Sequence, residues 1–169
     1  ELSKKKGLDF LLPTLWNSEY LNKPPGLHWL IAGSIQLGRN FGPSSFDLPS
    51  EFTVRIVPAL LSTLVVPFGA LIQWQLCQKD RIASLATGSI LLTLLPVARH
   101  GRLAMLDGSQ LSAIALLWLL LLTLNETNWD RLRALGIGLV SSSMLLMKAP
   151  LLIPAFVAAL VPMVLTGEL

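Results

Sequence analysis

The feature that most constrains this chain is a series of apolar runs that begins near residue 53. The runs cover residues 54–76, 82–98, 109–124, 132–147 and 150–166. A helix of about 20 apolar residues crosses the hydrocarbon core of a bilayer, and the shorter runs need their polar flanks in the headgroup region. We therefore predict an all-α integral membrane protein with about five transmembrane helices in residues 53–169.

The composition excludes several other classes of protein. Hydrophobic residues make up 53% of the chain and charged residues 14%, with a mean hydropathy of +0.63. An ordinary soluble domain carries about a quarter charged residues, so neither a soluble fold nor a disordered chain is expected. The net charge is +3, and the basic residues lie at the ends of apolar runs rather than along one stripe. We therefore expect a lipid bilayer and no nucleic acid as a partner.

Residues 1–52 form a separate polar segment that is rich in proline and in charges of both signs. Helical spacing of apolar residues predicts one helix there, from about Pro24 to Leu37, with proline at its first positions. This run is too short and too mixed to span a bilayer, so we expect it to lie in the membrane interface. The stretch from Gly38 to Pro49 is then a loop.

Alternation of the predicted spans places residues 1–52, 99–108 and 148–150 on one side of the membrane, which we call side one. Residues 77–81 and 125–133 lie on the other side, side two. The short loops of the two sides carry nearly equal numbers of Lys and Arg, so the positive-inside rule does not orient the chain. Small residues at 134, 138 and 142 predict a close contact with a neighbouring helix. No internal repeat supports a transporter.

Side one collects ionisable residues at or near the ends of the predicted spans. They are Lys23, Arg55, Arg99, His100, Arg102, Asp107 and Lys148. Ionisable residues at membrane depth usually face a cavity or one another. Several cations near one carboxylate predict a pocket for an anionic headgroup such as a lipid phosphate. In that pocket, the Asp107 carboxylate could accept a proton or stabilise a positive charge.

Several of these residues also have a structural alternative. Lys23 either binds the ligand or anchors the chain at the interface, and Arg55 either binds it or pairs with Glu51 one turn earlier. Arg102 either binds it or flanks a span, as Lys and Arg commonly do. Asp107 either acts in the pocket or caps a helix N-terminus.

Three segments, in order along the chain, resemble one family of enzymes. Residues 9–14 (DFLLPT) and 19–31 (EYLNKPPGLHWLI), followed by Arg55, resemble a first extracytoplasmic loop. Residues 101–107 (GRLAMLD) are similar to a G-R-x-A-x-x-D segment, and residues 147–150 (MKAP) to a T-K-G-P turn. The family comprises the membrane glycosyltransferases of GT-C fold that use polyprenyl-phosphate sugars. It includes lipid A aminoarabinose transferases and protein O-mannosyltransferases.

The resemblance implies an enzyme that moves a sugar from a polyprenyl phosphate to a lipid, glycan or protein acceptor. Transfer would occur on the extracytoplasmic face, which places side one outside a bacterial inner membrane. Lys23 would contact the donor phosphate, and Asp107 would lie in the catalytic pocket. Arg102, Lys148 and Arg55 would support the phosphate or the helix arrangement.

The same resemblance also implies what this chain lacks. Asn22 stands where the lipid A transferases carry an acidic residue, so a zinc site like theirs is not expected, and a divalent metal stays an alternative. From the sequence alone, His100 has no metal-ligand partner at suitable spacing. The family's principal acidic motif is expected upstream of Glu1. This interpretation makes the chain an N-terminal-half fragment that is inactive by itself. The alternative is a non-catalytic polyprenyl-phosphate-binding or structural membrane subunit.

Overall fold

The computed structural model describes residues 14–15, 18–19, 24–41, 50–94, 99, 105–123 and 130–166. These residues are helical apart from two short antiparallel strands, β1 (Thr14–Leu15) and β2 (Ser18–Glu19). The helices are α1 (Gly26–Phe41), α2 (Glu51–Thr63), α3 (Val65–Leu76), α4 (Arg81–Thr93), α6 (Leu106–Leu122), α7 (Asp130–Lys148) and α8 (Leu152–Thr166). A 3-10 turn, η3 (Ala149–Leu151), joins α7 to α8. The predicted all-α class is confirmed.

Two stretches of the described chain are long and apolar enough to cross a membrane. They are Glu51–Leu76, which contains α2 and α3, and Asp130–Val161, which contains α7 and most of α8. The shorter apolar helices are α4 and α6. The total of about five crossings stays a prediction. Within the predicted span 82–98, α4 ends at Thr93 because Leu94 already has an extended backbone. Residues 95–98 lie outside the described residues.

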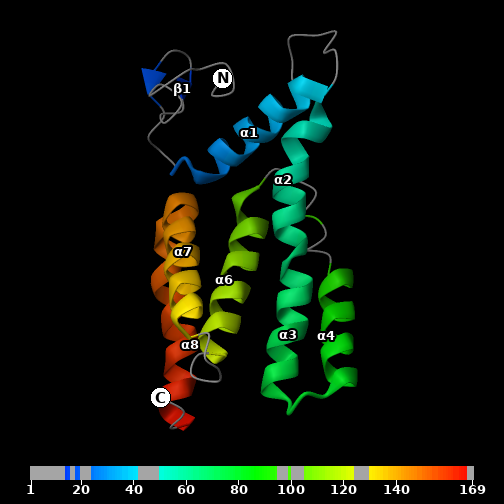
Figure 1. Cartoon of the computed structure of the whole chain (residues 1–169), viewed down its shortest axis with the longest axis vertical. Helices are drawn as coiled ribbons and strands as arrows, with labels where there is room; N and C mark the ends of the chain where they lie inside the picture. Colours follow the sequence, from blue (N-terminus) through cyan, green and yellow to red (C-terminus); the bar gives the residue numbers. More distant parts are fainter. Residues whose placement is uncertain are drawn as a thin grey trace.

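The helices stand side by side, with α1 lying across one end of the group (Figure 1). Helix α6 is central, because it packs against α2, α3, α7 and α8. The start of α2, the start of α6 and the end of α7 all lie at the end covered by α1 (Figure 1). We call this the α1 end. Residues 26–41, 51–52, 106–108 and 148, which alternation of the spans assigned to side one, belong to these helix ends.

The first predicted span, residues 54–76, is interrupted at Leu64, which separates α2 from α3. Pro67 has no N–H to donate to the carbonyl of Thr63, so the helix ladder is weakened at this point. The hydroxyl of Ser112 on α6 donates a buried hydrogen bond of 3.1 Å to the carbonyl oxygen of Ser62. Side-chain hydroxyls satisfy backbone groups beside prolines in membrane helices in the same way.

The buried core lies between α6, α7 and α8. Leu117 and Leu121 of α6 pack with Met144 of α7 and Ala155 of α8. The indole Nε1 of Trp118 donates a hydrogen bond of 2.9 Å to the carbonyl oxygen of Ala155. This core fixes the three helices relative to one another and thereby positions the residues at their ends.

Helix α1 differs from its prediction at both ends. It begins at Gly26, so the prolines precede the helix, and the N–H of Trp29 donates to the carbonyl oxygen of Pro25 at 3.0 Å. It continues to Phe41, so the first residues of the predicted Gly38–Pro49 loop are helical. Gly26 lies directly against the backbone of Leu146 on α7. This contact joins the start of α1 to the last turn of α7.

Candidate functional site

The predicted carboxylate and one of the predicted cations meet at the α1 end. Asp107 lies in the first turn of α6, which follows the extended residue Met105, and Lys148 is the last residue of α7. The Lys148 Nζ donates to Asp107 Oδ1 at 2.9 Å across 41 positions of sequence. The two residues meet because α6 and α7 are antiparallel neighbours, so that the start of one lies beside the end of the other (Figure 1).

The electrostatics of this pair suit a binding role better than a stabilising one. Each charge has the sign that its helix end favours: negative at an N-terminus and positive at a C-terminus. The side chains of Lys148 and Asp107 are 47% and 55% exposed, and ion pairs this exposed contribute only about 0–1 kcal/mol to stability. The bond to Asp107 uses one of the three ammonium N–H groups of Lys148, so the ammonium can also bind an anion.

The other predicted ligands are not brought to this pair in the described residues. Arg55 forms an ion pair of 2.6 Å with Glu51, one turn earlier on α2, which is the structural alternative for that residue. Lys23 and Arg102 lie outside the described residues. Asp107 does not cap α6, because Met105 occupies the N-cap position.

A metal site can be assessed only in the part of the chain that the structure describes. There, no group of three or more His, Cys, Asp or Glu side chains lies close enough to hold a metal ion. Asn22 and His100 lie outside the described residues. Among the described residues at the α1 end, an ion pair between α6 and α7 is formed by one carboxylate and one ammonium group, those of Asp107 and Lys148.

Sequence reasoning missed a set of buried polar residues that follows Asp107. Ser109, Gln110 and Ser112 are 3%, 1% and 3% exposed. Ser112 bonds to α2, whereas the Ser109 hydroxyl and both polar atoms of the Gln110 amide have no hydrogen-bond partner in the structure. The signal was a cluster of three polar residues at the start of the apolar run 109–124. The high mean hydropathy of the run as a whole made these three polar residues easy to overlook.

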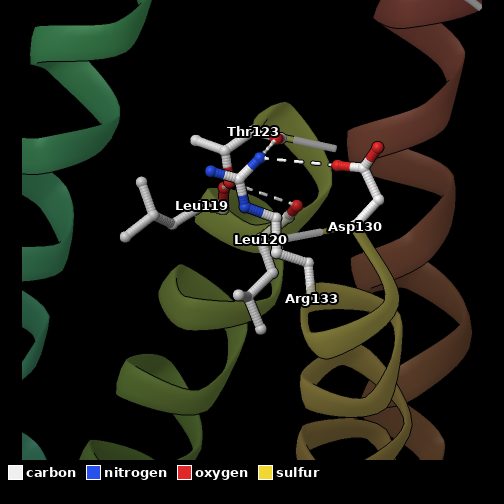
Figure 2. Close-up of polar contacts among 5 residues, drawn as sticks. All are labelled: Leu119, Leu120, Thr123, Asp130 and Arg133. Carbon is white, nitrogen blue, oxygen red and sulfur yellow. Dashed lines mark hydrogen bonds and ion pairs between the residues drawn. The ribbon is translucent and has the colours of Figure 1, made fainter. Parts of the chain in front are cut away.

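A second polar cluster lies at the opposite end of the α6–α7 pair, where Thr123, Asp130 and Arg133 meet (Figure 2). The guanidinium of Arg133 donates to the carbonyl oxygen of Thr123 at the C-terminus of α6 and lies 3.7 Å from Asp130 Oδ1. The Thr123 hydroxyl donates to the carbonyl oxygen of Leu119 at 2.8 Å. A cation at a helix C-terminus binds carbonyls that have no partner within the helix. Arg133 therefore holds this end of the pair together.

Arg133→Met is expected to lower the free energy of unfolding by about 1–2 kcal/mol, because a charge-assisted hydrogen bond to a helix terminus is lost. Thermal unfolding in detergent measures the effect. The control is Arg131→Met, two residues away, where the side chain is exposed. Equal stability of the two variants would contradict the capping role.

Comparison with known proteins gave no match. No family model matches the sequence, and neither a curated protein nor a solved structure is significantly similar to the chain.

Proposed function

We propose that this chain is part of a membrane glycosyltransferase that moves a sugar from a polyprenyl phosphate to an acceptor at the α1 end. The observation that carries the proposal is the contact between Asp107 and Lys148. Asp107 and Lys148 belong to the two segments, residues 101–107 and 147–150, that resemble family segments. In the fold these two side chains are in contact. The α1 end then faces the extracytoplasmic side of a bacterial inner membrane.

The outer surface of the helices supports a membrane location. Large apolar side chains project outward on several helices; examples are Ile82 on α4, Leu139 on α7 and Ile153 on α8, which are 81%, 73% and 73% exposed. Soluble monomers rarely expose apolar patches of more than a few hundred Å². Lipid acyl chains would cover these side chains in a bilayer.

The chemistry of the pair suits transfer from a phosphate leaving group. Sugar transfer passes through an oxocarbenium-like centre, and it requires stabilisation of the charge that develops on the departing phosphate. The Lys148 ammonium supplies a fixed positive charge for that phosphate. Asp107 supplies a carboxylate that accepts the acceptor's proton or stabilises the sugar cation. Lys23 is our proposed second phosphate ligand.

A second candidate is a non-catalytic subunit that binds polyprenyl phosphate or only supports the membrane assembly. One observation favours it: two of the predicted ligand cations are paired with carboxylates, Lys148 with Asp107 and Arg55 with Glu51. The two candidates differ in turnover, since only the enzyme requires Asp107 for sugar transfer.

The test is a sugar-transfer assay in membranes containing the protein expressed from its complete coding sequence. Polyprenyl phosphates carrying labelled sugars serve as donors. Asp107→Asn keeps an oxygen for Lys148 but removes the negative charge, and we expect it to lower transfer by about a hundredfold or more. We expect the same of Lys23→Ala, with membrane insertion unchanged in both variants.

The matched control is Asp80→Asn at the opposite end of the helices. Asp80 caps α4 by accepting from the N–H of Ile82 at 2.8 Å, and asparagine caps helices equally well. We expect this variant to transfer sugar at the wild-type rate. Near-normal turnover in both Asp107→Asn and Lys23→Ala would overturn the proposed site.

A further inference from the structure

The side chain of Gln110, three residues after Asp107 on α6, is buried and has no hydrogen-bond partner among the described residues. It is 1% exposed, and within the described part of the chain neither its amide nitrogen nor its amide oxygen has a hydrogen-bond partner. A buried polar group that lacks a partner costs about 1–3 kcal/mol. The membrane-type surface of this fold makes such a group still less expected, unless a ligand supplies the partner.

Helix geometry places Gln110 in the seam between α6 and α7. It follows Asp107 by three residues, which puts the two on the same side of α6 and about 4.5 Å apart along the axis. It precedes Leu117 by seven residues, and Leu117 packs against Met144 of α7. On α7, Ser141 precedes Lys148 by seven residues, and its buried hydroxyl also has no partner. A polar track thus continues from the ion pair into the seam.

We infer that Gln110 binds hydroxyl groups of the sugar carried by the lipid-phosphate donor, an inference that rests on the proposed function. A carboxamide offers two N–H donors and one acceptor oxygen, which complement neighbouring hydroxyls. Being neutral, it has no charge to attract a phosphate, and an acyl chain offers it no hydrogen bond. Gln110 lies about one helical turn from Asp107, whose carboxylate holds Lys148, so we place the sugar beside Gln110 when its phosphate contacts Lys148.

Two buried methionines lie on α7 near the Lys148 end of the seam. Met144 and Met147 lie in the last turn of α7 before Lys148, and they are 0% and 8% exposed. Methionine side chains are unbranched and flexible, so they repack at low cost. Repacking of these side chains is the movement by which we expect a sugar to enter the seam. The sugar hydroxyls then supply the hydrogen bonds that the closed seam lacks.

Lipid binding to the complete protein in nanodiscs tests this inference. The probes are undecaprenyl phosphate and the same lipid carrying mannose, glucose or aminoarabinose. In the wild type we expect at least one glycosylated probe to bind about tenfold more tightly than undecaprenyl phosphate. Gln110→Met, which keeps the side-chain length and removes the amide, should reduce this preference to less than about threefold. The affinity for undecaprenyl phosphate itself should not change.

Stability in the absence of lipid separates sugar binding from a structural role. We expect Gln110→Met to unfold at the wild-type temperature or above it, because an unpaired buried amide is replaced by an apolar group of similar shape. Gln110→Asn withdraws the amide by one methylene and should also lose the preference. Gln36→Met on α1, where the glutamine is exposed, is the control and should keep it.

Two results would overturn the inference: a wild type that shows no preference for any glycosylated probe, or a Gln110→Met variant that keeps the preference. Both leave undecaprenyl phosphate bound. Failure of the proposed function gives a different result. In that case undecaprenyl phosphate does not bind, or its binding does not depend on Lys148.

Discussion

Exchanging the charges of Asp107 and Lys148 is expected to preserve the fold and to remove the activity. In the double variant Asp107→Lys with Lys148→Asp, the ion pair can form again. Each charge then opposes its helix dipole, at about 0.3–1 kcal/mol per end, and the exposed pair itself contributes only about 0–1 kcal/mol. Each end thus loses a favourable interaction and gains an unfavourable one of the same size, so the free energy of unfolding should fall by about 1–4 kcal/mol.

Function depends instead on where each charge stands. With the cation moved to α6 and the carboxylate to α7, the phosphate and the sugar would each face the wrong group. We expect undecaprenyl phosphate to bind about tenfold more weakly or worse, and sugar transfer to fall by about a hundredfold or more. The control is Arg81→Asp, an exposed residue at the opposite end of the helices. A double variant that transfers sugar like the wild type would show that the pair is only structural.

Gly26→Ala is expected to produce the largest loss of stability of any single substitution considered for the α1 end. A Cβ atom at this position would lie 2.8 Å from the carbonyl oxygen and 3.0 Å from the carbonyl carbon of Leu146. Both are backbone atoms in the last turn of α7, so they cannot rotate away. We expect the variant to lose about 1–3 kcal/mol and to separate α1 from α7, although alanine is the better helix former.

Gly33→Ala in the same helix is the matched control for this substitution. A Cβ atom there meets nothing within 4 Å. We expect this variant to be as stable as the wild type or up to about 1 kcal/mol more stable, because only the helix propensity changes. Thermal unfolding in nanodiscs measures both variants. Equal unfolding temperatures for Gly26→Ala and the wild type would contradict the packing of α1 on α7.

Much of the fold could be predicted because the positions of the helices follow from apolar runs and polar breaks. The turn at residues 148–150 and the arrangement of helix ends on one side both follow from that pattern. The interruption at Leu64 does not, because a proline such as Pro67 is tolerated within some membrane helices and ends others. The start of α1 also depends on one contact, the hydrogen bond from the N–H of Trp29 to the carbonyl oxygen of Pro25.

The candidate site could be predicted only in part, because tertiary packing decides which helix faces meet. Counting spans placed Asp107 and Lys148 on one side, but the antiparallel packing of α6 and α7 creates their contact. The small residues at 134, 138 and 142 show the limit of periodicity. A Cβ atom at Gly138 would meet nothing within 4 Å in the structure, and Gly136 is the residue that lies against Leu120 on α6.

Photo-crosslinking tests the central claim most directly. The reagent is a polyprenyl phosphate with a photoreactive group beside the phosphate, activated in membranes that contain the complete protein, with the labelled peptides identified by mass spectrometry. We predict labelling of residues 105–112 and 144–151, the helix ends that carry Asp107 and Lys148, and loss of that labelling when unlabelled undecaprenyl phosphate competes. Labelling confined to the opposite end, around residues 77–81, or labelling that competition does not reduce, would contradict the account.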